Sequence, residues 1–311
     1  VMYSTPVGKI DPAVNGQLNL SYRHVEGWRR FFGVGKSLDL LMGDDTAGPY
    51  ILFSCFGPME DEMPRGPAHG HDSDTWRMSI LGTTNVGKYA YVDGQFRFQD
   101  GSISYPGDNV AWGPKGGYGV LVFGDRRGWP ACPVDKKLQE QAAVQQKPFS
   151  DKLGIQDEHP SPEGSAIAST LGETSLGHLD SSFDTAKDWD EVSPGIRATV
   201  SLMGDRRVGP VLVLLKGDPS ARVVPAGNLG TETLHVVVEG ACTVDGVTKT
   251  YGDFWLNEAG AQPEVVAGRE GLSHVLLIGE RQELSKFTVG DRDQNWIDAV
   301  AGVAAKLQTL L

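Results

Sequence analysis

The chain has 311 residues, a formal net charge of −12 and a pI near 5.0, and it is long enough for two ordinary domains. An acidic chain repels phosphate backbones and anionic membrane surfaces, so the charge argues against binding to nucleic acid or to a membrane. No apolar run approaches the roughly 18 residues of a membrane helix, and no signal-peptide pattern is present. We therefore expect a soluble, cytoplasmic protein.

Turn-forming residues are abundant, with 40 glycines and 18 prolines, whereas charged residues make up 22% of the chain. This composition favours many short strands joined by turns over a helical bundle, and we predict an all-β fold. The three cysteines, Cys55, Cys132 and Cys242, lie far apart without metal-type spacing. They are therefore interpreted as ordinary thiols.

A block near residue 41 begins a repeat, because residues 41–49 recur 161 positions later with the same order of glycine, aspartate and proline. The aligned blocks are 41–53 with 202–214, 67–82 with 225–240, and 107–108 with 252–253. Such collinear blocks indicate a duplication. Two closed antiparallel barrels would satisfy the strand edges that isolated sheets expose, so this is the predicted architecture.

The strongest chemical signal in the first copy is the pair His69 and His71. Two histidines separated by one residue on an extended strand point to the same side, so both imidazoles could reach one metal ion. Asp74 could add a hard oxygen ligand, which approaches the arrangement of two histidines and one carboxylate around non-haem iron. The alternative is that the histidines form hydrogen bonds within a turn and bind nothing.

These residues resemble the two sequence motifs of the cupin superfamily. The matching positions are His69, His71 and Gly82, then Gly107-Asp108 and Pro114-Lys115-Gly116, and in the second copy Glu232, Gly240, Gly252-Asp253 and Ala259-Gly260. The resemblance covers residues 41–127 and 202–280, as in a bicupin, and implies duplicated cupin-type (double-stranded β-helix) barrels. It also implies a divalent metal ion (iron, manganese, nickel or zinc), a small-molecule substrate, and dioxygenase, isomerase or lyase chemistry.

The first copy departs from the family pattern at two positions. Asp74 stands one residue before the family glutamate, whose place Thr75 takes, and Tyr118 or Gly119 stands where the third histidine is expected. A further ligand could then be water, Tyr118 or His24.

Arg77 and Tyr118 are the candidate catalytic residues, and strand parity leaves two orientations for Arg77. If Thr75 faces the barrel interior, Arg77 faces it too and could hold a substrate carboxylate. If Asp74 faces the interior, Trp76 and its alternate neighbours line an apolar pocket and Arg77 is solvated. We favour the second orientation.

The stretch from 136 to 165 is rich in glutamine, then in proline, acids and serine, as expected of an exposed connection. It divides the chain into a first barrel (1–135), a linker (136–165), a second barrel (166–290) and a C-terminal segment (291–311).

The second copy has lost most of the metal motif. Residues 227–229 carry no histidine, and Gln262 replaces the third one. We interpret this barrel as metal-free, with Glu232 satisfied by a local hydrogen bond and the apolar run 234–238 packed inside it. His235 is expected to face away from the cavity, and His159, His178 and His274 have no partner pattern.

Apolar residues recur at steps of three and four after Asp293, which predicts an amphipathic C-terminal α-helix that covers a barrel or the seam of a homodimer. Two functional hypotheses follow for the whole chain. The first is a metal-dependent enzyme acting on a small molecule in the first barrel. The second is a non-catalytic ligand-binding or assembly bicupin with a degenerate metal site.

Overall fold

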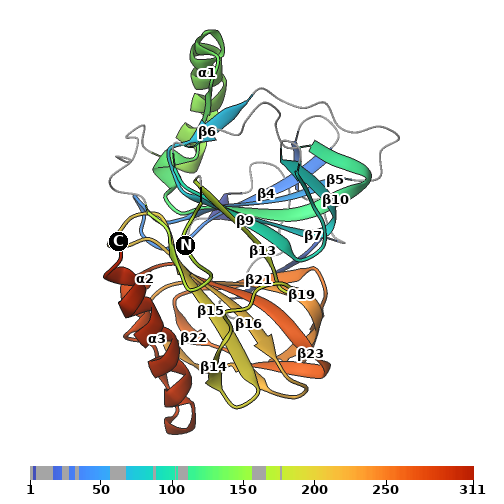
Figure 1. Ribbon diagram of the computed structural model, residues 1–311, viewed down its shortest axis with the longest axis vertical. Coiled ribbons are helices and arrows are strands. Elements are labelled where there is room, and N and C mark those ends of the chain that lie inside the picture. Colours follow the sequence, from blue (N-terminus) through green and yellow to red (C-terminus); the bar gives the residue numbers. More distant parts are fainter. Residues whose placement is uncertain are drawn as a thin grey trace.

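The computed structural model describes residues 3–4, 17–22, 28–31, 35–56, 68–86, 89–101, 103, 111–155, 166–175 and 177–311, and the statements below concern these residues. They form two β-barrels placed one above the other, with helix α1 rising from the first and helix α3 lying along the second (Figure 1). The predicted all-β architecture of two barrels with a C-terminal helix is confirmed.

The first barrel is built around the strand order β1-β4-β5-β10-β7-β9-β13, with β3 beside β4 and β8 beside β7. A separate ribbon pairs β6 with β11. The strands are β1 (Tyr3–Ser4), β3 (Arg29–Phe31), β4 (Gly35–Leu41), β5 (Tyr50–Phe56), β6 (His69–His71), β7 (Thr75–Val86), β8 (Tyr89–Tyr91), β9 (Gln95–Gln99), β10 (Ala111–Phe123), β11 (Ala131–Pro133) and β13 (His178–Ser182).

The second barrel has the order β12-β15-β16-β23-β19-β21-β2, with β14, β17 and β20 as side pairings and a small sheet β22-β18-β24. The strands are β2 (Gln17–Ser21), β12 (Ala168–Ser169), β14 (Asp190–Ser193), β15 (Ile196–Leu202), β16 (Val211–Gly217), β17 (Arg222–Val224), β18 (Gly227–Leu229), β19 (Thr233–Val244), β20 (Val247–Thr250), β21 (Asp253–Asn257), β22 (Gly260–Gln262), β23 (Val265–Ile278) and β24 (Thr288–Val289).

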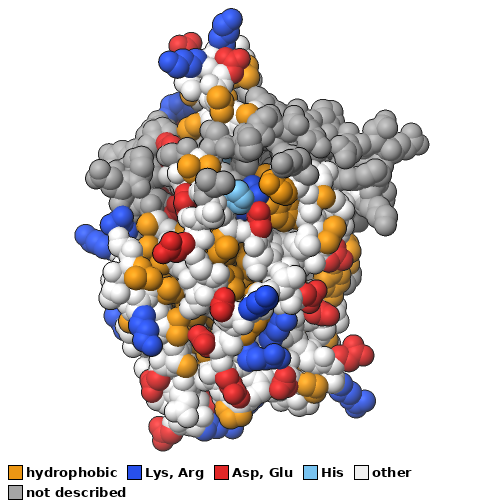
Figure 2. Space-filling view, in the orientation of Figure 1, with side chains coloured by type: hydrophobic (Ala, Val, Ile, Leu, Met, Phe, Trp, Pro, Cys, Tyr) orange, Lys and Arg blue, Asp and Glu red, His pale blue; other side chains and the backbone are white. Residues whose placement is uncertain are grey.

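The helices are short or peripheral. They are η1 (Arg126–Gly128), α1 (Lys136–Leu153), α2 (Arg281–Leu284), η3 (Asp291–Asp293) and α3 (Gln294–Gln308). No helix in the described part of the chain is both long and apolar enough to span a membrane. On the face in Figure 2, acidic and basic side chains are interspersed over the second barrel.

The two barrels exchange strands. The boundaries expected from the sequence, 1–135 and 166–290, assign each exchanged strand to the other barrel. Strand β2, from the N-terminal segment, pairs with β21 of the second barrel. Strand β13, which follows the linker, pairs with β9 of the first barrel. Each barrel is thus completed by a strand from the other half of the chain, and this ties the halves together.

A shared apolar core fills the space between the barrels. It contains alternate residues of both sheets, among them Phe53, Trp76 and Met78 from the first half and Leu234 and Phe254 from the second. The rings of Phe53 and Phe254 stack with centroids 3.9 Å apart. The apolar run of β19 is therefore only partly inside its barrel, because Leu234 and its alternate neighbours face the other barrel.

Two reciprocal hydrogen bonds connect the repeated loops across this seam. The Asp74 carboxylate accepts from the Gly204 backbone N–H at 3.2 Å, and the Glu232 carboxylate accepts from the Gly43 N–H at 2.8 Å. Both glycines have left-handed backbones, with φ of 71° and 67°. Glu232 is therefore hydrogen-bonded, as predicted, but its backbone donor lies across the seam and not nearby in sequence.

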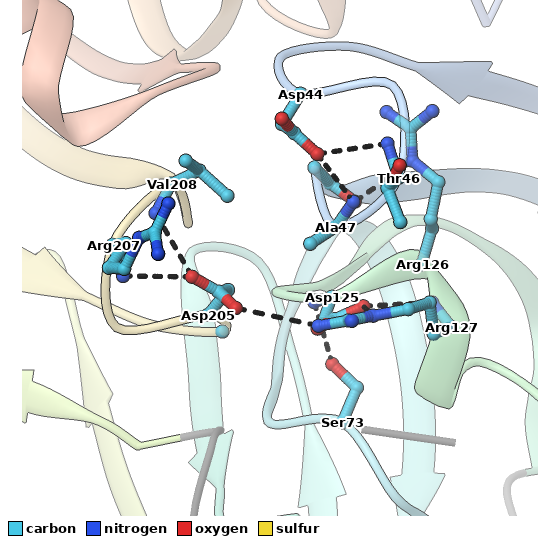
Figure 3. Close-up of polar contacts among 12 residues, drawn as sticks. Asp44, Thr46, Ala47, Ser73, Asp125, Arg126, Arg127, Asp205, Arg207 and Val208 are labelled. Atoms are coloured by element: carbon cyan, nitrogen blue, oxygen red, sulfur yellow. Dashed lines mark hydrogen bonds and ion pairs between the residues drawn. The ribbon is translucent and has the colours of Figure 1, made fainter. Parts of the chain in front are cut away.

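The loops themselves are held by the same contacts in both copies. Asp44 accepts from the N–H groups two and three residues later, and Asp205 does the same (Figure 3). Arg126 donates to backbone carbonyls of the first loop, and Arg281 donates to the equivalent carbonyls of the second. Arg127 bridges the copies, because it pairs with Asp125 and lies 3.4 Å from Asp205 (Figure 3).

Helix α3 covers the second barrel. Its apolar side chains are buried in that barrel's core, where they contact β14 and β15. The buried residues are Trp296, Ile297, Val300, Ala304 and Leu307. Of the two predicted roles for this helix, the structure shows the cover over a barrel.

Candidate functional site

The orientation of β7 decides what lies inside the first barrel. Trp76, Met78 and Ile80 pack in the shared core between the barrels. Because side chains alternate along a strand, Thr75 and Arg77 face the opposite side, which is the interior. The orientation that we favoured from the sequence is wrong: Arg77 is buried inside the barrel, with 8% of its surface exposed, and is not solvated.

The strand register places charged residues of neighbouring strands in one row across this interior. The partners in order are Asp39, Leu52, Leu121, Arg77, Arg97 and Asp180. Arg77 and Arg97 are thus direct neighbours, and like charges side by side in a protein interior are costly unless anions compensate them.

Asp180 compensates part of this charge. It accepts two hydrogen bonds from Arg97, at 2.7 and 3.0 Å, and one from the Tyr91 hydroxyl at 2.8 Å. Burial and the neighbouring Arg97 lower the pKa of Arg77 to about 9, while Tyr91 and Asp180 act in the opposite direction. Arg77 still carries its charge at neutral pH, so the interior contains a buried cation.

An acidic group lies on the same interior face, further along the row. Asp39 is fully buried and accepts a 2.6 Å hydrogen bond from the Tyr50 hydroxyl. A carboxylate and a phenol in direct contact can pass a proton between them and a bound molecule. Neither residue belongs to a motif that the sequence reveals.

Next to the charged row lies a row of small residues. The register aligns Ser37, Ser54, Gly119 and Ser79 across four strands. The interior of a small barrel is normally filled by its side chains, and small residues fill less of it than large apolar ones. Among the described residues, the buried hydroxyls of Ser37 and Thr75 have no hydrogen-bond partner. Such groups are expected to find a partner in a bound molecule or in water.

His71 is placed at the edge of this interior. Its ring lies against Phe123, with centroids 4.8 Å apart, and its pKa is lowered to about 3 by burial and by the neighbouring His69 and Arg77. The Nδ1 atom lies 2.7 Å from the Trp129 carbonyl oxygen. A carbonyl can only accept, so Nδ1 carries the proton and Nε2 keeps a lone pair, as a metal-ligating imidazole requires.

The two histidines come together, but the third predicted ligand does not join them. The rings of His69 and His71 are 5.1 Å apart and perpendicular. The Asp74 carboxylate accepts from Gly101 and Gly204 at the seam, so it is directed away from them. Among the described residues, no three His, Cys, Asp or Glu side chains form a group that could hold a metal ion.

Tyr118 is not brought to this site either. It lies in the shared core and stacks on Tyr22 with centroids 5.0 Å apart. Its neighbour Gly119 occupies the interior position, so strand parity turns Tyr118 toward the other barrel. Two further candidates, His24 and the Gly107-Asp108 motif, lie outside the described residues.

The second barrel provides an internal comparison. At the level of the small row it carries Ala198, Leu215, His274 and Val237. At the level of Asp39, Arg77 and Arg97 it carries Val200, His235 and Trp255. Mostly apolar side chains therefore line the interior of the second barrel at these two levels. The equivalent positions of the first barrel carry small residues at one level and charged residues at the other.

From the sequence we expected His235 to face away from the cavity of the second barrel. The structure shows the opposite, because His235 lies inside that barrel. Its Nδ1 atom lies 3.0 Å from Nε2 of His274, and its ring stacks on Trp255. Its Nε2 atom contacts Thr233 and Asn257, at 3.1 and 3.2 Å. His274 had no sequence pattern to reveal this pairing, because the two histidines lie on different strands.

No protein-family model matches the chain, and no curated protein matches it. Among solved structures, the chain is similar to a protein from Nostoc punctiforme that is provisionally called a dioxygenase (10% identity, 85% of this chain and 83% of that one, TM-score 0.47). It is also similar to a variant of the oxalate decarboxylase of Bacillus subtilis (12%, 97% and 88%, 0.44), an enzyme with Mn(II) centres. A third similar structure is the vicilin of hazelnut, Corylus avellana (11%, 84% and 85%, 0.42). At these identities and TM-scores the likenesses carry no argument about function.

Proposed function

We propose that the first barrel binds a small anionic molecule in its interior and acts on it with a divalent metal ion held by His69 and His71. The observation that carries the proposal is the buried Arg77 beside a row of small residues and the hydroxyls of Ser37 and Thr75, which have no hydrogen-bond partner in the described part of the chain. A guanidinium can bind a carboxylate through two parallel hydrogen bonds.

The metal part of the proposal rests on the donor set. His71 is neutral with its Nε2 lone pair available, and His69 lies beside it, so the two imidazoles fit iron, manganese, nickel or zinc as two of its ligands. When bound, the ion would polarise a ligand oxygen or offer an open position to dioxygen. Arg77 would orient the carboxylate.

We expect metal content to depend on the two histidines. Protein purified without a histidine tag should contain metal in wild type and lose it in a His69→Ala, His71→Ala double variant, as measured by elemental analysis. His178→Ala is the control, because this partly exposed histidine lies on β13 and not on β6, the strand that carries His69 and His71. Stoichiometric metal that persists in the double variant would remove these residues from the proposal.

We expect anion binding to depend on Arg77. A panel of small mono- and dicarboxylates is tested by thermal shift, since a ligand that binds only the folded state raises the melting temperature. Arg77→Met should abolish the rise, and so should Ser54→Leu, which introduces the residue found at the equivalent position of the second barrel. Arg197→Met, at a half-exposed arginine, should keep it.

If Arg77→Met and Ser54→Leu both kept the full ligand-induced rise in melting temperature, the binding site would lie elsewhere in the chain. The assignment of the site to the interior of the first barrel would then be wrong.

A second candidate function is a ligand-binding or assembly protein without catalysis. It is favoured by the absence of a third metal ligand beside His69 and His71 among the described residues. This candidate predicts carboxylate binding that depends on Arg77 but no bound metal, so the two experiments above separate the candidates.

A further inference from the structure

We propose that helix α1 positions His71, and that Gln146 is the positioning residue through which it does so. The inference deepens the proposed function, on which its metal-binding consequence rests. It begins with the ribbon of β6 and β11, in which His71 is paired with Ala131 and His69 with Pro133. Strand β6 pairs with β11 and has no other strand partner in the described part of the chain, so β11 helps to hold the histidine strand in place.

Helix α1 holds the outer edge of β11. The Gln146 side chain accepts from the Ala131 N–H at 2.7 Å and donates to the Ala131 carbonyl at 3.1 Å. Gln139 adds a hydrogen bond to the Pro133 carbonyl at 2.9 Å. These two glutamine amides take the place of the backbone of a third strand beside β11.

The same helix also fixes the carbonyl that sets the His71 tautomer. The Trp129 carbonyl receives the Nδ1 proton of His71, and the Trp129 indole donates to the Ser150 hydroxyl at 3.1 Å. Just beyond the helix, Ile155 is buried against Tyr50 and Phe123 in the interior cluster of the first barrel. Residues 129–131 are therefore held at both ends by α1.

Release of this segment would free the His71 ring to rotate and to exchange its tautomer. Without the fixed acceptor at Trp129, the Nε2 lone pair would face the barrel only part of the time. Loss of such an outer hydrogen bond typically costs about 10- to 100-fold in metal affinity. The docked helix is thus the condition under which His71 can act as a ligand.

The test is the tautomer of His71 in metal-free protein, read from long-range ¹H–¹⁵N correlations of histidine-labelled samples. The His71→Gln variant assigns the signal. Wild type should show the Nδ1–H form, and a Gln146→Ala, Ser150→Ala double variant should show signals averaged between the two tautomers. Gln145→Ala is the matched control, because this neighbouring glutamine is exposed. Gln146→Glu keeps the acceptor for Ala131 but not the donor, and should give an intermediate result.

Zn²⁺ affinity, measured with a competing chelator, should fall at least tenfold in the double variant. An unchanged Nδ1–H form in a folded double variant would overturn the inference, whatever the metal result. A lost tautomer preference in a protein that binds no Zn²⁺ even as wild type would keep the inference and reject the metal part of the proposed function. Circular dichroism of each variant confirms that it folds.

Discussion

Asp74→Asn should lower the free energy of unfolding by about 2 to 4 kcal/mol, whereas Glu232→Gln should lower it by less than about 1 kcal/mol. The two residues occupy equivalent positions of the duplication but use their carboxylates differently. Both oxygens of Asp74 accept backbone hydrogen bonds, Oδ1 from Gly101 at 2.8 Å and Oδ2 from Gly204 at 3.2 Å. An asparagine presents an NH₂ group to one of these N–H donors, so one buried donor loses its acceptor.

Glu232 accepts two hydrogen bonds on one of its oxygens. Its Oε2 atom accepts from the Gly43 N–H at 2.8 Å and from the Thr231 hydroxyl at 3.2 Å. The carbonyl oxygen of a glutamine can accept both, which is why the effect is small. Guanidinium unfolding of chelator-treated protein measures the difference and excludes any contribution from bound metal.

The same pair of variants also tests the original interpretation of Asp74 as a metal ligand. If Asp74→Asn loses metal but keeps its stability, the carboxylate serves a metal and not the seam. A loss of metal in Glu232→Gln, with His69 and His71 intact, would show that the second barrel is the metal-binding one.

The duplicated architecture could be predicted from the sequence because collinear repeats survive where individual contacts do not. The alignment of residues 41–53 with 202–214 identifies equivalent strands without any knowledge of their pairing. The alignment of residues 67–82 with 225–240 pairs Asp74 with Glu232. What it cannot give is the partner of each carboxylate, because Gly204 and Gly43 belong to the opposite copy.

The orientation of β7 could not be predicted because both faces of this strand are buried. A strand with one wet face shows alternation of polar and apolar residues, but β7 packs against the second barrel on one face and encloses a polar interior on the other. The hydrophobic face was therefore taken for the barrel interior. The duplication held a usable signal: Leu215 of the second copy stands at the position of Ser54, where the first interior has the smaller side chain.

The buried histidine pair of the second barrel was missed for a different reason. His235 and His274 are 39 positions apart and meet only because β19 pairs with β23. A motif search looks for ligands at short spacing, so a contact made by strand pairing has no local signature. Likewise, the linker helix α1 carries too few apolar residues to reveal its contact with β11.

Stability should fall steeply as the pH is lowered below about 6.5, because the fold contains buried neutral histidines. Burial lowers the pKa of His274 to about 3 and that of His235 well below its usual value of 6.5, and burial with the neighbouring His69 and Arg77 lowers that of His71 to about 3. In the unfolded chain these residues take up protons near pH 6.5, while the folded protein does not. The unfolded state then binds more protons, so stability is complete above about pH 6.5 and is lost as the pH falls toward about 3.

Each such histidine contributes up to about 1.4 kcal/mol per pH unit in this window. The free energy of unfolding, measured in urea at several values between about pH 5 and 7.5, should therefore rise with pH, with a slope that decreases by about one proton in His274→Gln. Glutamine can still bond to Nδ1 of His235, so the variant should remain folded. His178→Gln replaces a histidine that pairs with Asp180 in a partly exposed position, and serves as the comparison. An equal slope in His274→Gln and wild type would mean that His274 is protonated in the folded protein, and that its contact with His235 is not the neutral pair described above.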